Sequence, residues 1–174
     1  MTHFEPTQII DNVARVQERI ADACARANRD PAAVTLVAVS KKKPQADILA
    51  AVEAGLRHFG ENRVEESGVK IPAVDEQLAE AVTWHMVGHI QSRKARTIPH
   101  LFDVVHSLDS VKLASKLSGL VAEQEQSLDV FLQINIAGED QKYGFEATGW
   151  QSDKAVQDRL WGDLREVLGL PGLN

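Results

Sequence analysis

Hydrophobic positions near the N-terminus recur at alternating spacings of four and three residues, which predicts a helix with one buried face. The series consists of Ile9, Val13, Val16, Ile20, Ala23 and Ala27. Such spacing places side chains on one stripe of an α-helix. Cys24 lies beside the stripe, and we expect it to be a small core residue, because burial in apolar surroundings makes a thiol inert. The pair Asp30-Pro31 is expected to end the helix.

The next apolar stretch predicts a strand that is covered on both faces. Residues 34–40 are rich in β-branched side chains and show no polar alternation, which is typical of strands in parallel sheets. Pro44 then suits the first turn of a helix. Ile48, Leu49 and Val52 would lie on the buried face of this helix, and Gly55 is expected to end it.

This strand-then-helix pattern occurs five times along the chain. The further strands are expected at 58–60, 83–88, 101–106 and 128–136, with helices beginning near Glu61, Gln91 and Asp109 and a last helix through Trp161, Leu164 and Val167. Strict alternation of strands and helices indicates an α/β protein with a parallel sheet. Two architectures fit the pattern, a doubly wound sheet and a part of a (β/α)₈ barrel.

Polar residues follow all five expected strands. In both architectures ligands bind at the C-terminal ends of the strands, where the chain places Ser40-Lys41, Gly60-Glu61-Asn62, Gly88-His89, His106-Ser107 and Asn135. Lys41 carries the clearest chemistry, because a low-dielectric position at the end of a buried strand favours the neutral amine that attacks aldehydes. The alternative is a lysine that extends into water, since Lys42 and Lys43 follow and such a run is typical of a solvated turn.

Other kinds of site lack their motifs. Neither the P-loop pattern nor the dinucleotide-binding glycine pattern occurs, and no serine lies in a G-x-S-x-G turn. His85 and His89 are four residues apart on a strand and its loop, and they lack the helical spacing and the nearby glutamate of a zinc motif, so no metal site is expected. Residues 138–142 are expected to form a solvated connection.

Composition narrows the class of protein further. The chain has 174 residues, 44% of them hydrophobic, and a net charge of −6, which suits one domain with a core of its own and disfavours general binding to nucleic acids. No apolar run approaches the roughly 18 residues of a membrane span, and residues 1–6 lack the features of a secretory signal. One cysteine excludes a disulfide framework. We therefore expect a cytoplasmic protein.

Six sequence blocks in this order resemble the pyridoxal-phosphate homeostasis protein family, whose fold resembles the N-terminal barrel of alanine racemase. The blocks are Ala38-Val39-Ser40-Lys41-x-Lys43-Pro44, Phe59-Gly60-Glu61-Asn62, Trp84-His85-Met86-Val87-Gly88-His89-Ile90-Gln91-Ser92-x-Lys94, His106-Ser107-Leu108-Asp109-Ser110, Gln133-Ile134-Asn135-Ile136 and Lys142-Tyr143-Gly144-Phe145. The resemblance runs from about Val34 to the end of the chain, and the leading helix also fits it.

The resemblance implies a (β/α)₈ barrel that holds pyridoxal 5′-phosphate (PLP) as a Schiff base on Lys41, with a further cofactor contact from Asn62. It implies a single PLP-binding domain over residues 1–174, monomeric in the full-length family. It also implies a role in vitamin B6 homeostasis, in which PLP-dependent enzymes receive the cofactor and no catalytic turnover is established.

The chain departs from the family in length, because it carries about five of the eight βα units of such a barrel. Residues 170–174 resemble the approach to a sixth strand. In the family, the remaining part supplies the phosphate cradle and an arginine near the pyridine ring. We therefore expect weaker PLP binding, and open sheet edges that favour association. Two alternatives stay open: a fragment that no longer binds PLP, and an amino-acid racemase for which Tyr143 and His85 are the candidates for a second base.

Overall fold

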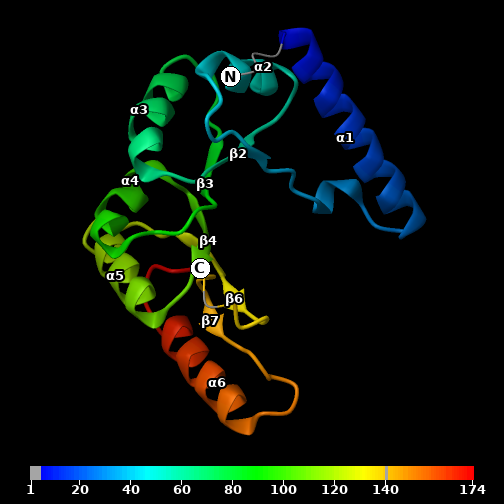
Figure 1. Ribbon diagram of the computed structural model, residues 1–174. Coiled ribbons are helices and arrows are strands. Elements are labelled where there is room, and N and C mark those ends of the chain that lie inside the picture. Colours follow the sequence, from blue (N-terminus) through cyan, green and yellow to red (C-terminus); the bar gives the residue numbers. More distant parts are fainter. Residues whose placement is uncertain (1–4, 140) are drawn as a thin grey trace. The chain divides into compact units, whose positions relative to one another are not determined.

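The chain folds into two compact units, which the computed structural model describes over residues 5–139 and 141–174. The described part of the first unit comprises residues 5–61 and 65–83, and the second unit comprises residues 62–64 and 84–174 (Figure 1). Residues 1–4 of the N-terminal segment lie outside the described residues, as does Asp140 within the expected loop 138–142.

The first unit begins with a long helix and contains the first two strands. Its elements are α1 (Pro6–Arg26), the short 3₁₀ helix η1 (Pro31–Ala33), β1 (Ala38–Val39), α2 (Gln45–Glu53), β2 (His58–Glu61) and most of α3 (Val64–Asp75). The strands β1 and β2 run parallel, with Ala38 opposite Phe59 and Val39 opposite Gly60. The predicted order of helix, strand, helix, strand and helix is thus confirmed.

Helix α1 forms where the sequence predicts it, but its stripe is only partly covered. Pro6 occupies the first turn, where its missing N–H is no loss, and the N–H of Glu5 donates to Oε1 of Gln8 at 3.2 Å. The helix contacts α2 and η1. These neighbours bury Val13 and Cys24, which confirms the core position of the thiol. The expectation of a fully buried stripe is wrong, because Val16, Ala23 and Ala27 are exposed.

The strand expected over residues 34–40 is shorter than predicted and is not covered on both faces. The ladder that joins β1 to β2 begins at Ala38, and it ends where the N–H of Ser40 donates to the carbonyl of Gly60 at 2.9 Å. Within the first unit Val39 is 52% exposed. The β-branched composition therefore indicated an extended backbone correctly, whereas the burial inferred from it was wrong.

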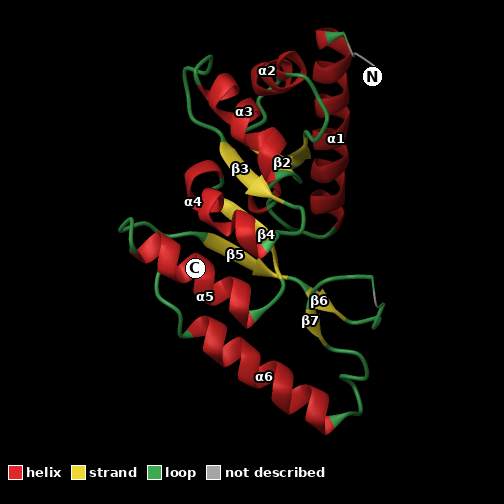
Figure 2. Ribbon diagram, turned by 60° about the vertical axis from the view of Figure 1, so that its left-hand side comes forward, coloured by secondary structure: helices red, strands yellow, loops and turns green. Residues whose placement is uncertain are grey.

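The second unit contains three parallel strands of the predicted pattern, as Figure 2 shows. The strands are β3 (Thr83–Met86), whose first residue still belongs to the first unit, β4 (Val104–Leu108) and β5 (Asp129–Leu132). They are connected by the 3₁₀ helix η2 (Ser92–Thr97) with α4 (Ile98–Leu101), and by α5 (Val111–Ala122). His85 lies opposite Val104, which in turn lies opposite Asp129. The helix expected from Gln91 is replaced by η2 and the short α4, which contains Pro99 in its first turn.

The long strand expected over residues 128–136 divides at Gln133. The N–H of Gln133 donates to the carbonyl of Leu108 in β4, whereas its own carbonyl accepts from the N–H of Phe145. The chain thus passes from one ladder to another, and β6 (Ile134–Asn135) pairs in parallel with β7 (Phe145–Glu146). β7 was not predicted from the sequence.

The C-terminal part of the second unit consists of helix α6 (Lys154–Leu168) and a segment that returns to the sheet. The predicted helix is confirmed. The rings of Trp150 and Trp161 lie edge to face, with their centroids 5.8 Å apart. Residues 172–174 lie parallel to Leu128 and the start of β5 and are joined to them by backbone hydrogen bonds of 2.9 to 3.1 Å. Within residues 5–139 and 141–174 no helix is long and apolar enough to cross a membrane.

Candidate functional site

The turn that follows β1 presents Lys41. The N–H of Lys43 donates to the carbonyl of Ser40 at 3.0 Å, which closes a four-residue turn with Lys41 and Lys42 at its centre. Lys42 has a φ of +60°. The second central residue of a tight turn often requires such a value, which residues other than glycine and asparagine seldom adopt. Ser40 is buried and Lys41 is exposed, so the turn carries the amine from the covered end of the strand to the surface of its unit.

The burial expected for Lys41 is wrong in this structure. That expectation rested on a strand covered on both faces, and the exposure of Val39 and Lys41 removes its premise. Of the two interpretations left open by the residues, a lysine reaching toward water describes its surroundings better. An exposed primary amine remains accessible to a carbonyl compound, but the argument that desolvation favours the neutral amine of Lys41 no longer applies.

A buried network of charges lies directly behind this turn. Oε1 of Glu61 accepts from Oγ of Ser40 at 2.7 Å and from Nζ of Lys70 at 2.9 Å. Lys70 also donates to Oε1 of Glu66 at 2.7 Å and to the carbonyl of Ser40 at 3.1 Å. The N–H of Lys42 donates to the same Glu66 oxygen at 2.9 Å. Glu61 is completely buried and Lys70 is 8% exposed, so these charges interact largely away from water.

Of this network, Glu61 at the end of β2 was noted from the sequence, whereas Glu66 and Lys70 were missed. The signal was present, since a glutamate four residues before a lysine on a helix forms a favourable pair. What the pattern does not reveal is that both side chains turn toward β1, because that depends on how α3 packs within the first unit.

Asn62 lies in the second unit, where Gly88 fixes its backbone. A Cβ added to Gly88 would lie 2.3 Å from the carbonyl oxygen of Asn62, so the two backbones approach more closely than any side chain permits. Oγ of Ser107 donates a hydrogen bond to the carbonyl of Gly88 at 2.6 Å and so fixes the position of the Gly88 backbone. Among the described residues, the buried Oδ1 of Asn62 has no hydrogen-bond partner. Because Lys41 belongs to the first unit, the convergence of Lys41 and Asn62 on one ligand stays a prediction.

Two pairs of histidine contacts lie at the strand ends of the second unit. Nδ1 of His85 and Nε2 of His106 are 2.8 Å apart, and the ring of His106 stacks on Phe131. Desolvation lowers the pKa of His106 below its ordinary value and so favours its neutral ring, and in a neutral pair one of the two nitrogens donates the hydrogen bond and the other accepts it.

The second pair places an imidazole between a carboxylate and a phenol ring. Nδ1 of His89 lies 3.0 Å from Oδ2 of Asp109, and the His89 ring stacks on Tyr143 with centroids 3.5 Å apart. A carboxylate at Nδ1 orients an imidazole for proton transfer at Nε2. In the part of the chain that the structure describes, no group of three or more His, Cys, Asp or Glu side chains is arranged to hold a metal ion.

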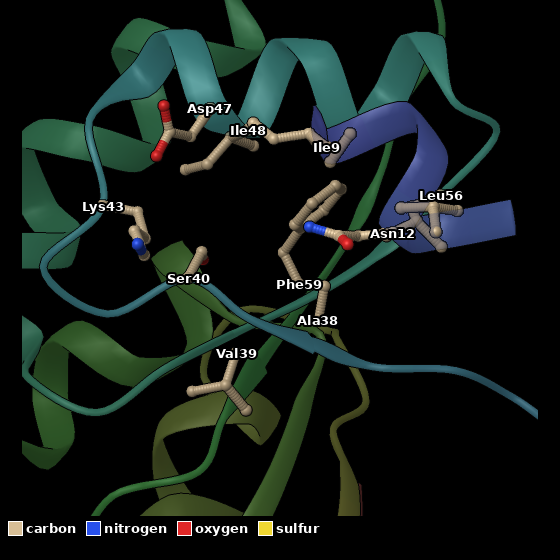
Figure 3. Close-up of a pocket in the computed structure, with 12 residues that line it drawn as sticks. Ile9, Asn12, Ala38, Val39, Ser40, Lys43, Asp47, Ile48, Leu56 and Phe59 are labelled. Atoms are coloured by element: carbon tan, nitrogen blue, oxygen red, sulfur yellow. The ribbon is translucent and has the colours of Figure 1, made fainter. Parts of the chain in front are cut away.

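A mainly apolar cavity of about 230 Å³ lies beside the Lys41 turn, and it was not anticipated from the sequence. Figure 3 shows its walls: Ile9 and Asn12 come from α1, Ile48 from α2 and Phe59 from β2. Ser40, Lys43 and Asp47 form its polar side. Both carboxylate oxygens of Asp47 are buried and lack a hydrogen-bond partner among residues 5–139 and 141–174.

Comparison with known proteins places the chain among PLP-related proteins. The family model "Alanine racemase, N-terminal domain" matches residues 8–161. The pyridoxal phosphate homeostasis protein of Pasteurella multocida is 38% identical over 94% of this chain and 70% of its own length. The protein of the same name from Escherichia coli is 38% identical over 79% of this chain, which spans 59% of that relative.

Solved structures give the same result for the fold. The structure of PipY from Synechococcus elongatus with PLP bound matches 91% of this chain and 66% of its own, with 33% identity and a TM-score of 0.72. A protein from Bifidobacterium adolescentis described as unknown matches the whole chain and 70% of its own, with 29% identity and a TM-score of 0.81. The predicted α/β fold of the alanine racemase N-terminal type, with five parallel strands, is therefore confirmed.

Proposed function

The chain belongs to the pyridoxal phosphate homeostasis protein family, and on that premise we propose that it binds PLP covalently through Lys41. The observation that carries the proposal is the position of Lys41, an exposed lysine in a tight turn directly after β1. This lysine lies in the block Ala38-Val39-Ser40-Lys41-x-Lys43-Pro44, through which the sequence resembles the family. The PLP-bound structure of PipY, 33% identical to this chain, supports the choice of ligand.

The described residues suit PLP at two points. Lys41 supplies an accessible primary amine, and Asn62 supplies a buried amide oxygen that lacks a partner. When bound, PLP supplies an aldehyde, the carbonyl that a primary amine attacks with loss of one water. Lys41 would hold the cofactor covalently, and the amide of Asn62, whose backbone is fixed against Gly88, would orient it through a hydrogen bond.

The proposed role is the storage and delivery of PLP within the cell, with PLP-dependent enzymes as recipients. Free aldehydes react with exposed amines, so holding the aldehyde on Lys41 would limit such side reactions. Because condensation of an amine with an aldehyde is reversible, Lys41 would release the cofactor when water adds back, and the free lysine would be regenerated. This role requires binding and release, and it requires no second group that moves a proton on a substrate.

An amino-acid racemase activity is the second candidate, and one observation favours it. The pair of Asp109 and His89 positions an imidazole against Tyr143, and such a dyad is able to serve as a proton-transfer group. Incubation of the chain with PLP and L-alanine or L-serine in deuterated water distinguishes the two functions. Exchange of the α-hydrogen that disappears in His89→Gln would support the enzyme, whereas no exchange supports the carrier role.

Reduction with borohydride tests the proposed attachment of PLP. The chain is incubated with PLP, reduced and digested, and the modified lysine is identified by mass spectrometry. We expect the label on Lys41, its loss in Lys41→Ala, and unchanged labelling in Lys112→Ala, which removes an exposed lysine on α5. A wild-type chain that carries no label, or labels that are spread evenly over exposed lysines, would contradict the proposal.

A further inference from the structure

The buried charges behind the Lys41 turn contact the backbone on both sides of this residue. On the N-terminal side, the carbonyl of Ser40 accepts from Nζ of Lys70 at 3.1 Å, and the Ser40 hydroxyl donates to Glu61 at 2.7 Å. On the C-terminal side, the N–H of Lys42 donates to Glu66 at 2.9 Å. Lys70 joins the two sides, because its ammonium group contacts both carboxylates.

These contacts also stabilise an unfavourable backbone conformation. Lys42 has a φ of +60°, and a residue with a side chain keeps such a conformation only where the surrounding structure enforces it. The acceptor for its N–H is a carboxylate whose position is fixed by Lys70, and hydrogen bonds to charged acceptors are stronger than those to neutral ones. The network therefore stabilises a turn conformation that residues 40–43 would not keep in isolation.

We propose that Glu61, Glu66 and Lys70 act as a charged clamp that positions Lys41 for its reaction with an aldehyde. The inference rests on the proposed function of Lys41 and adds positioning residues to it. None of the three side chains needs to contact the cofactor. Their effect is to fix the peptide groups before and after Lys41, so that its side chain is the mobile part of the turn.

The clamp combines the two ion pairs of Lys70 with hydrogen bonds to the backbone and hydroxyl groups of Ser40 and Lys42. Apolar side chains in place of Glu66 and Lys70 would leave the N–H of Lys42 without its carboxylate acceptor and the carbonyl of Ser40 with one donor fewer. The ammonium group of Lys70 contacts both carboxylates, so removal of Lys70 would leave the completely buried charge of Glu61 without this cation, and removal of Glu61 would take away one of the two partners of Lys70. Variants of these two residues are therefore prone to unfold, and Glu66, with a side chain 28% exposed, is the better position for a test.

The test compares two Glu66 variants with a matched control. Glu66→Ala removes the acceptor for the Lys42 N–H, whereas Glu66→Gln keeps a carbonyl oxygen there. Asp158→Ala breaks another helical ion pair of the same spacing, between Lys154 and Asp158 on α6. The first readout needs no cofactor: hydrogen exchange of the Lys42 amide, followed by NMR, should become about tenfold faster in Glu66→Ala. It should change less in Glu66→Gln and stay unchanged in Asp158→Ala.

The second readout is the ratio of the PLP label on Lys41 to that on Lys43, a residue that every variant keeps. We expect this ratio to fall in Glu66→Ala and to recover most of the loss in the double variant Glu66→Ala with Lys42→Gly, because glycine adopts a positive φ without strain. Thermal unfolding of each variant checks that all samples are folded and measures any general change of stability, so that the label ratio is compared among folded chains.

The outcomes separate the clamp from the proposed function. If wild type shows no label on Lys41, the proposed function fails, and the exchange of the Lys42 amide still reports on the clamp. If Lys41 is labelled in wild type but Glu66→Ala changes neither amide exchange nor the label ratio, the clamp is refuted. Faster exchange with an unchanged label ratio would also refute it, since the turn would then be held without any effect on Lys41.

Discussion

Replacement of Gly88 by alanine should destabilise the second unit strongly, although it adds a single methyl group. The new Cβ would lie 2.3 Å from the carbonyl oxygen of Asn62 and 2.8 Å from its carbonyl carbon and Cα. Ordinary contacts begin near 3.4 Å, so one backbone segment would have to move by about 1 Å. All three contacted atoms belong to the backbone, and therefore no change of side-chain rotamer relieves the clash.

Overpacking of this kind costs about 3 kcal/mol, the upper end of the usual range, because rigid backbone is displaced. For a chain of this length that corresponds to a melting temperature lowered by about 6 to 12 °C. The assay is thermal unfolding followed by far-ultraviolet circular dichroism. The displacement would also move Asn62, so the yield of PLP label should fall at a temperature where the variant is still folded.

Gly119→Ala in α5 and Gly162→Ala in α6 are the matched controls. A Cβ added to either glycine would meet no atom within 4 Å, and neither glycine has a positive φ, so alanine should stabilise each helix by about 0.5 to 1 kcal/mol. The controls should therefore melt about 1 to 4 °C higher than wild type. A Gly88→Ala variant as stable as wild type would refute the reasoning, because the contact with Asn62 would then not be tight.

Three further predictions concern pH, the thiol and the cofactor. Burial lowers the pKa of His106 in the folded chain, so the unfolded chain binds more protons below about pH 7. The free energy of unfolding should therefore fall from pH 7 to pH 5. Urea titrations should show a smaller fall in His106→Gln than in His100→Gln, which replaces an exposed histidine and serves as the control. Cys24, 5% exposed, should react with iodoacetamide much more slowly in the folded chain than in urea, and equal rates would contradict its burial. The chain spans 59% of the Escherichia coli relative, and spectrophotometric titration should show that it binds PLP more weakly than that relative, since loops or helix N-termini elsewhere in the relative would hold the phosphate; equal affinity would contradict this.

The order of elements could be predicted from local patterns, whereas burial could not. The spacing of apolar residues in α1 and the glycine at position 55 predict where helices begin and end, and these positions depend little on tertiary packing. The exposure of Val39 depends on which chain segments cover β1, and the sequence of a strand does not reveal its neighbours. The same reason explains why the expected burial of Lys41 was wrong although the lysine itself was identified.

Contacts between distant residues account for the parts of the candidate site that the sequence did not reveal. The approach of Gly88 to Asn62 joins positions 26 residues apart, and neither residue has a local signal for it. β7 is a two-residue strand that begins where the carbonyl of Gln133 accepts a hydrogen bond from the N–H of Phe145. The Glu66–Lys70 pair has a recognisable spacing, but its effect on Ser40 and Lys42 follows from the packing of α3 on β1.

The distribution of tryptophan gives the two units separate optical properties. Trp84, Trp150 and Trp161 all lie in the second unit, and residues 5–61 and 65–83 of the first contain none. Trp84 is 3% exposed, whereas Trp161 is 48% exposed and meets Trp150 edge to face. Intrinsic tryptophan fluorescence therefore originates in the second unit, whereas circular dichroism reports on the helices of both units, so unfolding of the second unit should change both signals.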